Sequence, residues 1–171
     1  KMGVLDVVAK INNKQNVDIE MQMISNEKLP ERILYYWARL FSKGIKKGDT
    51  IGIVAPSGPF RATTLGEIEN ALNDLGYNVK FGESCYGSYK GYLSSEDDIR
   101  AKDIEDMFLD KTVDGIFCLR GGYGTPRILD LIDYNIIKNN PKFFVGFSDI
   151  TGLHIAFNKY ADLVTFHGIM A

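Results

Sequence analysis

From Lys46 onward the sequence alternates short apolar runs with segments of helical periodicity. The runs are of strand length, and several end at glycine, serine or proline. Strands are expected at residues 50–55, 77–81, 114–119, 143–145 and 163–166, and helices at 67–75, 95–109, 126–132 and 149–160. Strands that alternate with helices need crossover connections, which favour parallel pairing. The sequence therefore predicts an α/β fold: a doubly wound, mostly parallel sheet of the Rossmann-like or flavodoxin-like kind, with an extra N-terminal segment.

Small and polar residues cluster just after four of these apolar runs. They are Pro56-Ser57, Arg120 to Gly124, Gly146 to Asp149 and His167-Gly168. In open α/β sheets, sites form beyond the carboxyl ends of the strands. The four clusters should therefore meet at one edge of the sheet and form one site.

The third cluster has the layout of a nucleophile elbow. An apolar run from Phe143 breaks at Gly146, Ser148 follows, and a helical pattern starts at Asp149. A strand–turn–helix of this kind exposes a serine hydroxyl beside free N–H groups at a helix N-terminus. The second glycine of the elbow pattern is replaced here by Ile150. The alternative is that Ser148 only caps the helix.

Composition narrows the class of protein. The chain has 171 residues, 20 Lys plus Arg and 22 Asp plus Glu, for a formal charge of -2. This balance gives no basic excess for nucleic acid and no polybasic block for a membrane surface. The two cysteines have no metal-ligand spacing, and no apolar signal segment is visible at the N-terminus. A cytoplasmic protein without a metal or other cofactor is the expectation.

Residues 1–45 differ in pattern from residues 46–171, and we treat them as an N-terminal extension of unknown role. The residues from Val4 to Ile11 fit a short amphipathic helix, and those from Val17 to Met23 alternate as in a strand. A further helix is expected from Pro30 to the stop at Gly44. No motif for catalysis or ligand binding is found in this segment, so a role in packing or in a subunit contact is expected. A homodimer is one assembly this would allow.

The motifs from Lys46 to the chain end resemble the LD-carboxypeptidase family, which also holds the microcin C self-immunity proteins. Each motif is weak alone, but their order is that of the family. They are Lys47-Gly48-Asp49 with Ile53 to Ser57, Tyr92-Leu93 with Asp98 and Arg100, Arg120 to Gly124 with Arg127 to Leu129, Gly146 to Thr151, and His167-Gly168.

The resemblance implies a cytoplasmic serine peptidase. Such enzymes cleave the amide between an L-centre and a terminal D-alanine in murein tetrapeptides during cell-wall recycling, whereas the microcin branch cleaves a peptidyl-nucleotide. It assigns Ser148 as the nucleophile and the backbone N–H groups of Gly122 and Asp149 as the oxyanion hole. The partner would be a small peptide, with no nucleic acid and no membrane.

Four residues are candidates for substrate binding: Ser57, Arg120, Tyr123 and His167. An arginine can grip a substrate carboxylate with two parallel hydrogen bonds. Arg127 could do the same, but a surface ion pair is the expected role for it.

The family's activating glutamate and histidine come from a second domain that these residues do not include. The resemblance therefore implies an incomplete triad and an inactive chain on its own. His154 lies six positions after Ser148, about one and two-thirds turns, and should be a packing residue. His167 is better placed at a strand end, where it either shapes the pocket or serves as a base.

Two alternatives stay open beside the peptidase. One is a non-catalytic module that binds a peptide or nucleotide at the same strand ends, and the other is an amide hydrolase of the microcin-immunity type. A dinucleotide-binding domain is disfavoured, because Ala55 to Pro59 do not match the glycine fingerprint that follows the first strand of such domains.

Overall fold

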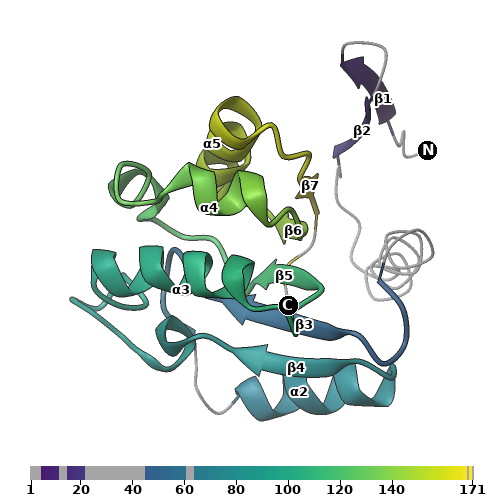
Figure 1. Ribbon diagram of the computed structural model, residues 1–171. Coiled ribbons are helices and arrows are strands. Elements are labelled where there is room, and N and C mark those ends of the chain that lie inside the picture. Colours follow the sequence, from purple (N-terminus) through teal and green to yellow (C-terminus); the bar gives the residue numbers. More distant parts are fainter. Residues whose placement is uncertain (1–4, 12–14, 22–44, 61–63, 169, 171) are drawn as a thin grey trace.

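A five-stranded parallel sheet forms the centre of the protein in the computed structural model, which describes residues 5–11, 15–21, 45–60, 64–168 and 170. Its strands run in the order β4-β3-β5-β6-β7 (Figure 1). Their bounds are β3 Thr50–Val54, β4 Asn78–Phe81, β5 Gly115–Cys118, β6 Phe143–Gly146 and β7 Phe166–His167. Every neighbouring pair is parallel, which confirms the predicted fold class.

Helices cover both faces of the sheet (Figure 1). The α-helices are α2 Leu65–Asp74, α3 Asp97–Leu109, α4 Tyr134–Asn139 and α5 Thr151–Ala161. Short 3-10 turns lie at η2 Glu83–Tyr86, η3 Thr125–Arg127 and η4 Ser148–Ile150. Helix α2 packs on one face, while α3, α4 and α5 pack on the other.

One predicted helix is wrong. The segment 126–132 forms only the turn η3 and further turns, and the helix α4 follows it. The reason is local, because the carboxylate of Asp133 accepts a hydrogen bond from the Asn135 N–H and so caps a new helix.

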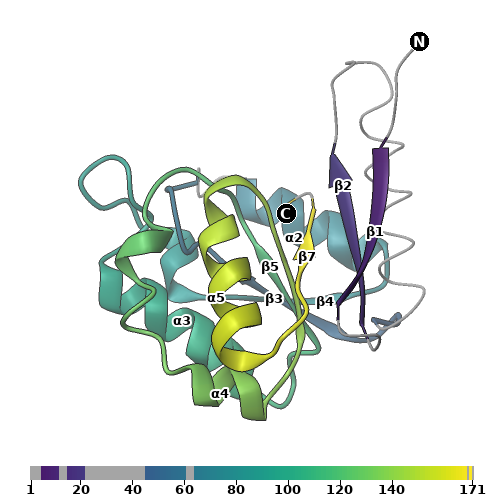
Figure 2. The same ribbon diagram turned by 90° about the horizontal axis from the view of Figure 1, so that it is seen from above.

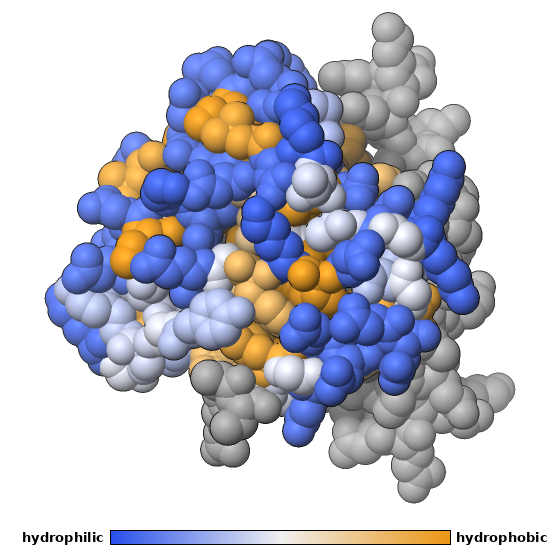
Figure 3. Space-filling view, turned by 60° about the horizontal axis from the view of Figure 1, so that its bottom comes forward, coloured by the Kyte–Doolittle hydropathy of each residue, from blue (hydrophilic) through white to orange (hydrophobic). Residues whose placement is uncertain are grey.

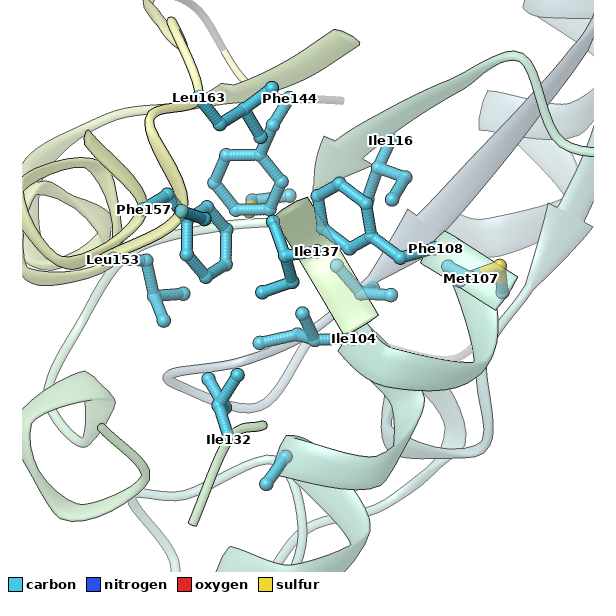
Figure 4. Close-up of a cluster of buried hydrophobic side chains, with 14 of the residues drawn as sticks. Ile104, Met107, Phe108, Ile116, Ile132, Ile137, Phe144, Leu153, Phe157 and Leu163 are labelled. Atoms are coloured by element: carbon cyan, nitrogen blue, oxygen red, sulfur yellow. The ribbon is translucent and has the colours of Figure 1, made fainter. Parts of the chain in front are cut away.

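Alternation along the strands divides the core between the two faces. In β3 and just after it, Ile51, Ile53 and Ala55 pack toward α2, whereas Val54 packs toward α3 and α5. On the second face Phe108, Phe144 and Phe157 form an aromatic group, with ring centroids 4.9 to 6.3 Å apart (Figure 4). The buried faces on both sides fix the register of the strands and hence the positions of their ends.

The strand order determines where the chain can form a site. After β3 the chain adds β4 on one side, and β5, β6 and β7 then follow on the other. Connections therefore leave the carboxyl ends of β3 and β5 in opposite directions, which opens a crevice in folds of this order. The loops after β3, β5 and β6 border it.

A separate antiparallel hairpin precedes the sheet. Strand β1, Leu5–Ile11, pairs with β2, Gln15–Met21, and β2 lies beside β7 (Figure 2). The helix expected at residues 4–11 is therefore wrong. Val7, Val8 and Ile11 are β-branched residues, which favour strands, and the pairing with β2 stabilises the extended conformation. The strand expected at 17–23 is confirmed in position from 17 to 21. The helix expected at 30–44 lies outside the described residues.

No helix in the described part of the chain has both the length and the apolar character needed to cross a bilayer. On the face shown in Figure 3, hydrophobic surface gathers near the centre and polar residues surround it.

Candidate active site

Ser148 lies in a strained turn between β6 and α5. Its φ of 61° places a non-glycine residue in the left-handed region. Such strain is uncommon and concentrates at functional sites. The turn also requires glycine at position 146, because a Cβ there would lie 2.3 Å from Cγ2 of the buried Ile150. Ile150 thus occupies the space that a side chain at position 146 would need. The elbow therefore forms with Gly146 alone, without the second glycine of the pattern.

The helix-cap interpretation of Ser148 does not fit this geometry. The N-cap residue of η4 is Phe147, and that of α5 is Ile150. Neither cap has a side-chain hydrogen bond. Ser148 instead occupies the first position of η4, where backbone N–H groups have no acceptor within the helix. Its carbonyl oxygen accepts a hydrogen bond from Thr151 Oγ1 at 2.6 Å.

The glycine turn after β5 lies directly against Ser148. A Cβ on Gly121 would be 3.0 Å from the Ser148 Cβ and 3.4 Å from its Oγ. Gly122 has a φ of 138°, and a Cβ there would lie 3.2 Å from the backbone of Gly58. A Cβ would therefore be crowded at both positions, and at Gly122 the backbone conformation also favours glycine, so the backbone of the turn approaches the serine closely.

The Gly121 carbonyl is held from two sides. It accepts hydrogen bonds from the Gly58 N–H at 3.3 Å and from Arg120 Nε at 3.1 Å. In a trans peptide the C=O and the following N–H point in opposite directions. The Gly122 N–H consequently points away from Gly58 and is available as a donor.

Asp149 connects the three strand-end loops. Its Oδ2 accepts hydrogen bonds from Ser57 Oγ at 2.6 Å and from the Thr125 N–H at 3.0 Å. Its carbonyl oxygen accepts a third, from Thr125 Oγ1 at 2.6 Å. Ser57 and Thr125 are both fully buried. The role of Thr125 has no signal in the sequence, because it depends on loops 24 residues apart that meet only in the fold.

Arg120 lies at an open pocket of about 370 Å³, lined also by Pro59, Phe60, Thr64 and Ser88. Its guanidinium donates to the carbonyls of Gly121 and, through Nη1 at 3.1 Å, of Pro59. The side chain is exposed. Arg120 therefore both braces the glycine turn and presents a positive charge beside it.

Arg127 does not face the pocket. Its guanidinium grips the carboxylate of Asp97 with Nε 3.0 Å from both oxygens and Nη2 2.6 Å from Oδ2. This pair is the leading cause of the lowered pKa of Asp97. The ion pair expected from the sequence is confirmed.

Arg100 is fully buried behind the site, and no role for it is predicted from the sequence. Its Nη1 donates to the carbonyls of Pro56 at 2.5 Å and Gly124 at 3.1 Å, and Nη2 pairs with Asp97. One arginine thus fixes the loop after β3 against the glycine turn after β5. The Asp97-x-x-Arg100 spacing, which pairs the two side chains on one helix face, was the available signal.

The two histidines occupy different environments. His154 is buried, with Nε2 3.0 Å from the Gly146 carbonyl and Nδ1 2.8 Å from Thr165 Oγ1. Both ring nitrogens are engaged, so it is the packing residue expected. Burial is the main cause that lowers its pKa to about 4. His167 pairs with Gly146 in the sheet and lies beside Phe147, with ring centroids 5.0 Å apart; burial lowers its pKa also.

Aromatic side chains are exposed around the same edge. Tyr123 is 58% exposed, and its ring centroid lies 6.0 Å from that of Tyr92. Phe147, next to Ser148, is 49% exposed. These rings could contact a bound molecule without displacing the backbone of the turn.

Other reactive groups are poorly suited to catalysis. Burial raises the pKa of the Cys85 thiol to about 12 and that of Cys118 well above its ordinary value. Neither thiol is therefore an activated nucleophile. Within the described ranges, no group of three or more His, Cys, Asp or Glu side chains could hold a metal ion.

Comparison with family models matches two parts of the chain. Residues 51–168 match the LD-carboxypeptidase N-terminal domain, and residues 1–55 match the PD-(D/E)XK nuclease family transposase. The first match contains every candidate site residue. The second covers less than a third of the chain, includes the segment 1–45 whose pattern differs, and extends to residue 55.

Known relatives agree with the first match. The "Probable murein peptide carboxypeptidase" of Bacillus subtilis is 43% identical over 128 residues, which cover 75% of this chain and 40% of that protein. An MccF-like protein from Bacillus anthracis superposes with a TM-score of 0.70 at 32% identity, covering 74% of this chain and 39% of that one. A muramoyltetrapeptide carboxypeptidase from Oxalobacter formigenes gives 0.65 at 30%, covering 71% and 40%. The chain thus spans about two fifths of the length of each.

Proposed function

The chain belongs to the LD-carboxypeptidase family, and from this premise we propose that it carries the nucleophile and the oxyanion hole of a serine carboxypeptidase. Its substrate would be a murein tetrapeptide, cut at the amide before the terminal D-alanine, in the cytoplasm and during cell-wall recycling. The observation that carries the proposal is Ser148 in a strained turn, closely packed against the glycine turn after β5.

The proposed chemistry follows from these positions. Ser148 Oγ attacks the scissile carbonyl carbon, and the N–H groups of Gly122 and Asp149 stabilise the oxyanion that forms. The serine proton passes through a base to the leaving amine of D-alanine, and water then releases the acyl group from Ser148. Arg120 is the candidate partner for the substrate carboxylate, because it adds positive charge at the edge of the same turn.

The base would come from a glutamate and histidine outside these residues. His154 cannot take this role, because both of its ring nitrogens already have partners. His167 lies at the same edge of the sheet, and we assign it a structural role there, packed against the ring of Phe147.

The test measures D-alanine released from murein tetrapeptide by two protein forms. One is this chain, and the other joins residues 46–171 to the part of the Bacillus subtilis relative that lies beyond the matched segment. We expect turnover in the joined form and a rate lower by a factor of about 100 to 10,000 in the chain alone, because a general base contributes about that much.

Substrate controls separate the alternatives. A tetrapeptide with terminal L-alanine should not be cut. Cleavage of a peptidyl-nucleotide in preference to the tetrapeptide would assign the microcin-immunity activity instead. Binding of the tetrapeptide without turnover in either form would leave a non-catalytic binding module and end the peptidase proposal.

A further inference from the structure

We propose that Ser57 and Thr125 are positioning residues that hold the nucleophile turn through the side chain and carbonyl of Asp149. This inference rests on the proposed function, because it assigns a role in that reaction to residues that do not touch substrate. The proposal is based on one observation: the buried hydroxyl of Ser57 and the backbone N–H of Thr125 both donate to the carboxylate of Asp149.

The contacts converge on a single residue from two other loops. Ser57 follows β3, Thr125 follows the glycine turn after β5, and Asp149 follows β6. The three hydrogen bonds to Asp149 measure 2.6, 3.0 and 2.6 Å. Both oxygen-bearing ends of Asp149, its carboxylate and its carbonyl, are therefore fixed.

The burial of the donors makes the arrangement rigid. Ser57 and Thr125 have no solvent exposure, so water cannot replace them as partners without opening the site. A hydrogen bond to a charged acceptor is also stronger than a neutral one. The carboxylate is thus held in one orientation by two neutral donors.

The fixation of Asp149 also affects Ser148, the residue before it in the chain. Ser148 has a positive φ, which persists only where the surroundings impose it. Fixing Asp149 imposes it from the C-terminal side, because the two residues share a peptide unit. The same fixation aims the Asp149 N–H, one of the two proposed oxyanion donors.

Ser57 also lies close to the other donor. A Cβ on Gly122 would be 3.4 Å from Ser57 Oγ. Loss of the Ser57 hydroxyl therefore loosens both sides of the proposed oxyanion hole. A substrate-binding role for Ser57, by contrast, would require exposure that it does not have.

The experiment compares Ser57→Ala with Ser84→Ala. Ser84, in η2, is an equally buried serine whose Oγ accepts a hydrogen bond from the N–H of Ala55, two residues before Ser57, at 3.1 Å, and it has no hydrogen bond with Asp149. Each variant loses one buried hydroxyl, so a purely structural role predicts equal effects. Thr125→Val, which removes the bond to the Asp149 carbonyl, is a second variant should Ser57→Ala fail to fold.

The first readout is hydrogen exchange in the purified chain, which does not depend on catalysis. Ser57→Ala and Thr125→Val should speed exchange of the Thr125 amide and of residues 146–151 at least about tenfold, and Ser84→Ala should not. Unchanged exchange in both Ser57→Ala and Thr125→Val would overturn the proposal.

The second readout is turnover in whichever form releases D-alanine. We expect kcat to fall about 10- to 100-fold in Ser57→Ala with KM nearly unchanged, and to fall less than about threefold in Ser84→Ala. Equal kcat values in the two variants would refute the positioning role. If Ser148→Ala also kept its turnover, the proposed function would fail instead, and if neither form were active the exchange readout alone would decide.

Discussion

His154 should make the stability of the protein depend on pH in a window set by its burial. The ring is 8% exposed, and burial is the main cause that lowers its pKa from 6.5 to about 4. The hydrogen bond to Gly146 opposes this shift, and the neighbouring His167 adds to it. The unfolded chain therefore binds a proton at mildly acidic pH that the native protein does not.

The sign and the size follow from linkage. Stability is complete above pH 6.5 and is lost as the pH falls from 6.5 toward 4, because the unfolded state binds more protons there. Between pH 7 and pH 4.5 the protonation of this one group removes about 2.5 kcal/mol of the free energy of unfolding.

The assay is urea unfolding followed by far-ultraviolet circular dichroism at both values of pH, for the wild type and for His154→Gln. Other titrating groups act on both proteins, so they cancel in the difference. The variant should be the less stable one at pH 7, and its disadvantage should shrink by about 2 kcal/mol at pH 4.5. A disadvantage that stays constant between the two would refute the account of this histidine.

Three further predictions concern the parts that support the site. Arg100→Leu should lower the free energy of unfolding by about 3–5 kcal/mol in chemical denaturation, because it removes a buried charge and leaves its carbonyl partners unpaired; a loss below about 1 kcal/mol would contradict this. Gly121→Ala should keep the fold but cut turnover about a hundredfold, since its Cβ would press on Ser148 at 3.0 Å; full activity would show that the turn is not close-packed in solution. A chain of residues 45–171 should melt cooperatively and keep the exchange pattern of the sheet, if the division near residue 45 is a domain boundary; loss of the folded state would place the hairpin within the domain.

Local pattern was enough to predict the parallel sheet and the strand-end loops that meet at its edge. The apolar runs that became β3, β5 and β6 are buried on both faces, and their ends are marked by Pro56, the glycines after Arg120 and Gly146. Because parallel strands share one carboxyl edge, these local marks also predict which loops meet. The prediction that Ser57, Gly122, Ser148 and His167 meet at one edge of the sheet agrees with the contacts of Ser57 with Asp149, of Gly122 with Ser57, and of His167 with Gly146.

The features that were predicted wrongly or missed depend either on tertiary contacts or on a competing local signal. Residues 5–11 have apolar spacing compatible with a helix, and pairing with 15–21 decided for a strand. Asp133 starts a new helix where Pro126 was expected to have started a longer one. The attachment of Asp149 to Ser57 joins loops 92 residues apart, so no pattern along the sequence could indicate it.

The most direct test of the central claim is turnover by Ser148→Ala in the form that releases D-alanine. The substitution removes only a hydroxyl, and Ser148 caps neither helix, so the melting temperature and tetrapeptide binding by calorimetry should barely change. We expect the rate of D-alanine release to fall by several powers of ten. Full turnover, together with a lowered melting temperature, would show that Ser148 serves the fold and is not the nucleophile.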